Sequence, residues 1–118
     1  MSNDLFAGAN VIISIKATHE IRDDSGFRTL KKTKGELVLT EKEFVFLEVK
    51  GTFKKEKTRR YAFPVEALTG QAYERWSGGP TTLYLTYDAK GGTETLIFSV
   101  SKGDYDKFIG VVHERRII

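Results

Sequence analysis

Apolar and polar residues alternate over most of the chain. In the segments 35–40 and 81–87, leucine recurs at every second position, which is the period of a strand with one buried face. The surrounding sequence is rich in β-branched and aromatic residues and is interrupted by turn residues, as is typical of strands joined by short connections. We therefore expect seven strands, over about 11–21, 35–40, 44–49, 59–63, 71–76, 81–87 and 93–100.

The connections between these strands carry turn signals. A polar, glycine-containing excursion over 21–32 separates the first two strands, and a short reversal over 40–43 joins the second to the third. Pro64 ends the fourth strand, since proline has no N–H to donate to a ladder. Ser-Gly-Gly-Pro at 77–80 predicts a turn. Asp-Ala-Lys-Gly-Gly at 88–92 predicts a hairpin, because paired glycines permit positive φ.

The period changes near residue 101. Four apolar residues then follow the i, i+3, i+4, i+7 spacing of one helical stripe: Tyr105, Phe108, Ile109 and Val112. Ser101 can act as the N-cap, with Asp104 at the capping-box position. This pattern predicts a C-terminal amphipathic helix.

Seven antiparallel strands of this length cannot bury an apolar face in a flat sheet. They are expected to form a sandwich or a partly open barrel, closed by the helix with Phe108 and Val112 as the plug. The length of 118 residues fits one domain. We expect residues 1–9 to be a flexible lead-in and 10–118 to be that domain, mainly β with one C-terminal α-helix.

Two short motifs resemble a known group of domains. Gly35-Glu36-Leu37-Val38-Leu39-Thr40 followed by Phe44-Val45-Phe46 is similar to the hairpin of GRAM-type domains, and 63–70 is similar to the strand-four exit of the same group. Together with the element order, they make the chain resemble the pleckstrin-homology-like superfold, in its GRAM and bacterial PH-like branch, over about residues 11–116. The resemblance implies a seven-stranded antiparallel, partly open barrel capped by the helix. No phosphoinositide pattern of the K-x(n)-K/R-x-R type spans the end of the first strand and the start of the second.

Several classes of chemistry lack support in the sequence. Cysteine is absent, which excludes disulfides, thiol nucleophiles and thiolate metal sites. His19 and His113 do not have metal-ligand spacing, and Ser77 is not in a G-x-S-x-G elbow. We therefore expect no enzyme, no cofactor and no metal.

The chain has no apolar run of the ~18 residues that a membrane span requires. Its first residues also lack the charged-then-apolar order of a signal peptide. The expected location is therefore cytoplasmic, with peripheral contact to a membrane left open.

The net charge of +3 hides an asymmetry along the chain. Residues 28–60 hold eleven basic and five acidic residues, a net +6, so the remainder carries −3. The segments RTLKKTK (28–34) and KGTFKKEKTRR (50–60) dominate this window. A segregated charge of this kind produces a local positive field.

The pleckstrin-homology resemblance implies that the loops after strands one, three and six share one open end of the barrel. The candidate anion- or ligand-binding residues at that end are Arg28, Lys31, Lys32, Lys50, Lys54, Lys55, Lys57 and Lys90. The leading hypothesis is a non-enzymatic binding or adaptor module that engages an anionic membrane surface or a protein partner through these basic loops. Phe53, between lysines, either inserts at an interface or packs back on the barrel.

Other interpretations stay open at this point. Basic residues interleaved with Phe27, Phe53 and Tyr61 also suit a nucleic-acid-binding domain that uses the same patch. Lysine-rich loops can equally serve only to keep a β-rich protein soluble and guard its edges. An enzyme or ligand carrier ranks third and requires a concave pocket with convergent polar groups. The oligomeric state is left open.

Overall fold

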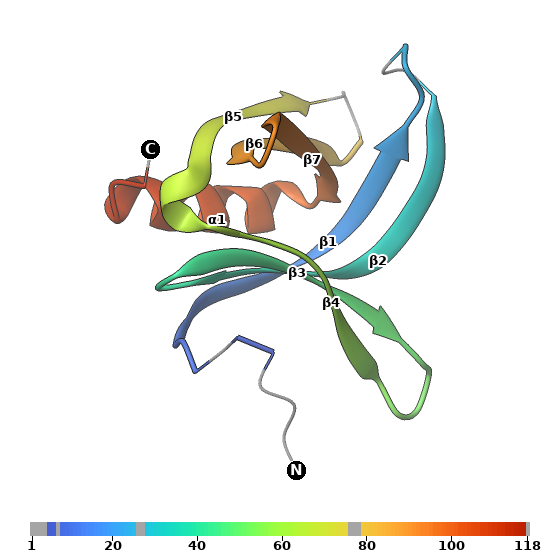
Figure 1. Cartoon of the computed structure of the whole chain (residues 1–118). Coiled ribbons are helices and arrows are strands. Elements are labelled where there is room, and N and C mark those ends of the chain that lie inside the picture. Colours follow the sequence, from blue (N-terminus) through green and yellow to red (C-terminus); the bar gives the residue numbers. More distant parts are fainter. Residues whose placement is uncertain (1–4, 7, 26–27, 76–78, 118) are drawn as a thin grey trace.

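The computed structural model describes residues 5–6, 8–25, 28–75 and 79–117 (Figure 1). Within these ranges, seven strands are followed by one α-helix, α1 (Lys102–Glu114), and a short 3₁₀ turn, η1 (Val65–Ala67), joins β4 to β5. The strands are β1 (Val11–Arg22), β2 (Thr29–Thr40), β3 (Glu43–Lys50), β4 (Glu56–Pro64), β5 (Leu68–Arg75), β6 (Thr81–Ala89) and β7 (Gly92–Val100).

All seven strands belong to one antiparallel sheet with the order β4-β3-β2-β1-β7-β6-β5. The sheet curls, so that β5–β7 lie opposite β1–β4 and α1 lies along the side between them (Figure 1). Strands β4 and β5 are its two edges. The predicted fold class, a partly open seven-stranded antiparallel barrel with a C-terminal helix, is confirmed.

The first hairpin is longer than predicted. Half of the excursion expected over 21–32 is strand, since β1 continues to Arg22 and β2 already begins at Thr29. Lys31 and Lys32 therefore lie on a strand, opposite Ile21 and Glu20. Ladder hydrogen bonds to β1 outweigh the low strand propensity of the lysines.

The fourth strand also differs from the prediction at both ends. It begins at Glu56 rather than near residue 59, and it includes Pro64, which lies opposite Glu43. Proline is tolerated there because β4 is an edge strand, where one N–H can be missing without breaking a central ladder. Strand β5 starts at Leu68, earlier than expected. The first two residues of the turn predicted at 77–80 lie outside the described residues.

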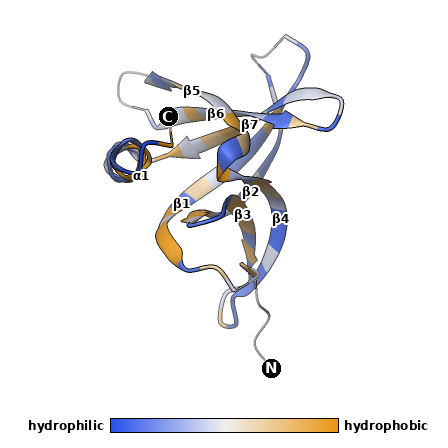
Figure 2. Cartoon of the chain, turned by 60° about the vertical axis from the view of Figure 1, so that its left-hand side comes forward, coloured by the Kyte–Doolittle hydropathy of each residue, from blue (hydrophilic) through white to orange (hydrophobic). Residues whose placement is uncertain are grey.

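The core fills the inside of the curled sheet. The residues predicted to share the inner face of β2, β3, β6 and β7 do so and are almost fully buried: Leu37, Leu39, Phe44, Phe46, Leu83, Leu85 and Phe98. In Figure 2, β1 and β3 carry orange apolar stretches, whereas much of β4 is blue.

A second apolar cluster lies on the outer face of β2 and β3. Val38, Val45 and Leu47 are buried there, and Leu5 and Phe6 pack over them. The Arg59 guanidinium holds the N-terminal segment by donating from Nη1 to the Leu5 carbonyl oxygen at 3.0 Å. Both faces of this part of the sheet are therefore covered.

Helix α1 begins as predicted. The Ser101 hydroxyl oxygen accepts a hydrogen bond from the Asp104 N–H at 3.1 Å, which satisfies one of the free donors of the first turn. The buried residues of the helix are those of the predicted stripe: Tyr105, Phe108, Ile109 and Val112. Phe108 has no exposed surface, and its ring centroid lies 6.0 Å from that of Phe44. The predicted plug is thus in place.

One histidine is part of the core. The His19 ring lies among Tyr61, Phe98 and Phe46, with centroids 4.5, 5.5 and 5.6 Å away, and only 5% of the residue is exposed. Burial lowers the pKa of His19 below 6.5, while Glu20 opposes this shift and Lys31 adds to it. A charged imidazolium is disfavoured at this position because it would lose its hydration.

This burial makes the free energy of unfolding depend on pH. Because the folded-state pKa is lowered, stability should be fully present above the unfolded pKa of about 6.5 and fall as the pH drops below it. One proton limits the slope to about 1.4 kcal/mol per pH unit. Urea denaturation between pH 7.5 and pH 5.5 (about one unit either side of that pKa) measures it. His19→Phe should flatten the slope, whereas replacement of the exposed His113 by Gln should leave it unchanged. An equal slope in both variants would contradict this assignment.

Candidate functional site

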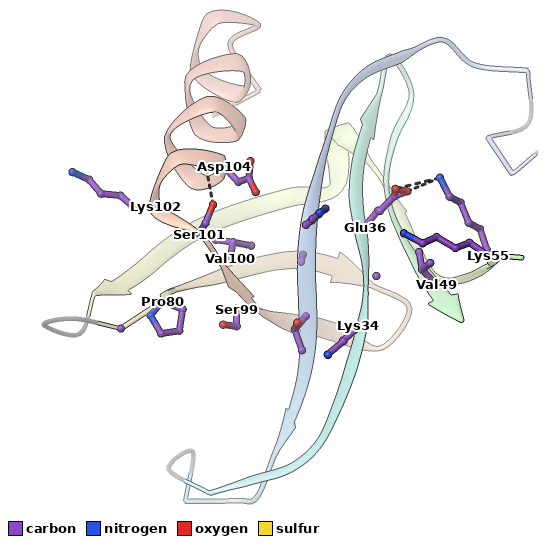
Figure 3. A pocket seen from close by; sticks show the side chains of 16 residues that line it. Lys34, Glu36, Val49, Lys55, Pro80, Ser99, Val100, Ser101, Lys102 and Asp104 are labelled. Atoms are coloured by element: carbon purple, nitrogen blue, oxygen red, sulfur yellow. Dashed lines mark hydrogen bonds and ion pairs between the residues drawn. The ribbon is translucent and has the colours of Figure 1, made fainter. Parts of the chain in front are cut away.

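An open groove of about 890 Å³ lies on the outer side of β1 and β2 (Figure 3). The register places Lys16 opposite Glu36 and Thr18 opposite Lys34, so these four side chains form the floor. The β3–β4 hairpin forms one wall with Val49, Lys55 and Lys57. The opposite wall consists of residues 79–80, before β6, and residues 99–102 and 104, at the junction of β7 and α1.

The charge of the groove is mainly positive. Its five lysines face two carboxylates, those of Glu36 and Asp104. Lys57 already pairs with Glu36, with Nζ 2.7 Å from Oε1. Asp104 lies in the first turn of α1, at the positive end of the helix dipole.

The remaining four lysines of the groove lack such partners among the described residues. In the described part of the chain, no ion pair is found for Lys16, Lys34, Lys55 or Lys102. Lys55 reaches across toward β2, whereas Lys102 points away from the strands (Figure 3). The groove therefore offers three ammonium groups on the strand side, which can bind phosphate oxygens as mobile point charges.

Two acidic residues of β3, Glu43 and Glu48, are neutralised by arginines of β4. The Arg60 guanidinium donates to Glu48 at 2.6 Å and thereby lowers the pKa of that carboxyl, against the effect of burial, with Lys50 adding to the shift. Arg59 forms a bidentate pair with Glu43, at 2.7 and 2.8 Å. These two arginines are thus paired within the sheet, whereas Lys16, Lys34 and Lys55 have no ion pair among the described residues.

The structure brings together only part of the predicted site. Of the eight candidates, Lys55 and Lys57 line the groove. Lys50 and Lys54 lie in the same hairpin, outside the groove lining, and Lys90 lies in the turn between β6 and β7. Arg28, Lys31 and Lys32 lie toward the tip of the β1–β2 hairpin, and in Figures 1 and 2 this tip and the β3–β4 loop are at opposite ends of the molecule.

Three groove lysines were not among the candidates. Lys34 belongs to the basic segment 28–34, while Lys16 and Lys102 lie in segments of no unusual charge. The alternation of β1 places Lys16 and Thr18 on the outer side of the strand. This alternation was the one feature of the sequence that could have indicated that Lys16 faces outward. Lys16 and Lys34 lie in the same groove as Lys55 only because the four strands β1–β4 pair side by side.

The described residues contain neither a cluster of metal-ligating side chains nor a membrane-spanning helix. Within the described ranges, no three His, Asp or Glu side chains gather as a metal site would require. No helix of the described chain is long and apolar enough to cross a membrane.

Comparison with known proteins identifies the architecture. No family model matches the chain, and neither does any curated protein. Among solved structures, it is similar to the DH/PH domains of PDZ-RhoGEF in complex with GTPγS-activated RhoA, with a TM-score of 0.64 and 15% identity over 99% of this chain. It is also similar to the DH/PH domains of p115-RhoGEF, with a TM-score of 0.58 and 10% identity over 97% of this chain. The fold is pleckstrin-homology-like.

The pleckstrin-homology-like chain spans 35% of the length of each of these two structures. At 10–15% identity, the likeness establishes the fold alone. Membership of the GRAM or bacterial branch stays a prediction.

Proposed function

We propose that this pleckstrin-homology-like domain is a non-enzymatic binding module for anionic membrane surfaces. The observation that carries the proposal is the groove of about 890 Å³ in which Lys16, Lys34 and Lys55 have no ion-pair partner among the described residues. Its volume is within the range of about 300–1,000 Å³ that is usual for small-ligand sites, so a phosphate-bearing headgroup fits. Three lysines contribute about 3 kcal/mol of attraction to an anionic surface, or roughly 150-fold in partitioning.

A protein partner is the second candidate. One of the similar structures is a complex in which DH/PH domains are bound to activated RhoA, and the edge strands β4 and β5 leave backbone groups available for pairing. The groove favours the membrane, because several unpaired lysines around a hollow match clustered phosphates better than one peptide strand.

Vesicle sedimentation tests the membrane proposal. Phosphatidylcholine vesicles should bind the protein only when they contain phosphatidylserine, and added salt should weaken the binding by screening the charges. Lys34→Gln combined with Lys55→Gln should lower the partition coefficient by about 30-fold, since each lysine contributes about 1 kcal/mol.

The matched control removes the same charge elsewhere. Lys42, in the β2–β3 turn, and Lys107, on the exposed side of α1, are outside the groove. Their double replacement by Gln should change binding much less. An equal loss in both double variants would show that net charge alone attracts the protein to the membrane. Salt-dependent binding to a single-stranded oligonucleotide, with no binding to vesicles, would favour nucleic acid instead.

A further inference from the structure

Phe53 stands at the apex of the loop between β3 and β4, with its side chain entirely in solvent. Its relative exposure is 102%, compared with 61% for Leu30 and 52% for Tyr73, the next most exposed large apolar residues in the described chain. The ring does not pack back on the barrel. A fully exposed phenyl group contributes nothing to folding, and its exposure to water is unfavourable.

The loop is constructed so that it holds the ring outward. Lys50 and Glu56 form the last pair of the hairpin, and only five residues close it. Gly51 has φ +104°, and a Cβ at this position would lie 2.1 Å from the Lys54 carbonyl oxygen. The tight return of the chain therefore depends on a glycine.

Lysines lie on both sides of Phe53 in the chain. Lys54 and Lys55 follow it directly, and Lys50 precedes the turn. All three are exposed, and Lys55 also lines the groove. The apolar tip, the basic residues behind it and the groove are therefore continuous along one hairpin.

We infer that the β3–β4 hairpin inserts Phe53 into the interfacial layer of an anionic membrane while the lysines behind it contact the headgroups. This inference rests on the proposed function and adds its anchoring residue. A single apolar side chain with a basic collar matches the layering of a bilayer, apolar within and anionic at its surface. A protein interface would instead surround its central aromatic residue with a ring of further contacts that exclude water, and the loop offers no other large apolar residue.

Phe53→Ala tests the insertion. It should lower the partition onto phosphatidylcholine–phosphatidylserine vesicles by about 10- to 30-fold, at both low and high salt, because the lost contribution is apolar. Phe53→Trp should restore binding. Leu30→Ala, which trims an exposed apolar residue at the other hairpin, should bind like wild type.

A second measurement locates the residue directly. Because the chain has no cysteine, Phe53→Cys can be labelled with the environment-sensitive dye NBD and compared with Thr93→Cys at the exposed start of β7. Vesicles should shift the emission to the blue and strengthen it only at position 53. Wild-type binding of Phe53→Ala, or a label at position 53 that stays in water, would overturn the insertion and leave the groove proposal intact. Failure of the wild-type protein to bind vesicles would overturn both.

Discussion

Phe108→Ala is expected to lower the free energy of unfolding by about 3–5 kcal/mol. Phe108 is completely buried, and its ring lies against Phe44 at the place where α1 closes the curled sheet. Truncation leaves a cavity between two elements that cannot both collapse into it, since the strands are fixed by their ladders. A domain of this size commonly has only about 5–15 kcal/mol in total, so much of the stability should be lost.

Urea denaturation followed by circular dichroism measures this loss. Lys107→Ala, on the exposed side of the same helix, should change the free energy of unfolding by less than about 0.5 kcal/mol. Phe108→Leu keeps part of the apolar volume, so its free energy of unfolding should lie between those of Lys107→Ala and Phe108→Ala. This variant tests the prediction even if Phe108→Ala does not fold. Equal stability of wild type and Phe108→Ala would mean that the helix does not close the core.

The helix and the core were predictable because their signals are local. The stripe through Tyr105, Phe108 and Val112 repeats with the helical period, and Ser101 marks the start of the helix within the same fifteen residues. Strand alternation at Leu37 and Leu39 likewise depends on neighbours two positions away. Burial on one face follows from such patterns without any knowledge of the partner strand.

Strand ends and the groove were less predictable because they depend on pairing. Lys31 and Lys32 lack strand character in isolation and become strand only because β1 extends beside them. In the same way, Lys34 lines the same groove as Lys55 and Lys57, because Gly35 pairs with Glu48 and Val49 pairs with Lys57 across three strands. The sequence showed where basic residues are dense, and the dense segment 28–32 lies outside the groove.

The burial of the outer apolar cluster was also not predicted from the sequence. Val38, Val45 and Leu47 alternate with inward residues and would face solvent in a sheet with one buried side. Their burial depends on Leu5 and Phe6, which come from a segment expected to be a flexible lead-in. A continuous apolar run in neighbouring strands, rather than strict alternation, was the signal for a second covered face.

Gly35→Ala is expected to destabilise the domain by about 1–3 kcal/mol or more. A Cβ at this position would lie 1.9 Å from the Leu47 carbonyl oxygen and 2.9 Å from the Phe46 ring. The nearest atom belongs to the backbone, so β2 or β3 must move. The glycine that opens the GRAM-like motif is therefore required by the close approach of two strands, and its φ is not in the left-handed region.

Gly110→Ala adds the same methyl group but is expected to have the opposite effect on stability. Gly110 lies in the interior of α1, is exposed, and has nothing within 4 Å of the position that a Cβ would occupy. Alanine there should stabilise the domain by about 0.5–1 kcal/mol, because it reduces the freedom of the unfolded chain and favours the helix. In thermal unfolding, the melting temperature of Gly35→Ala should lie below that of wild type and that of Gly110→Ala above it. The two should differ by several degrees, since 1 kcal/mol corresponds to roughly 4 °C for a domain of this size. Melting of Gly35→Ala at the wild-type temperature would show that β2 and β3 have room to separate, and the strand packing beneath the lysine groove would then be looser than the register implies.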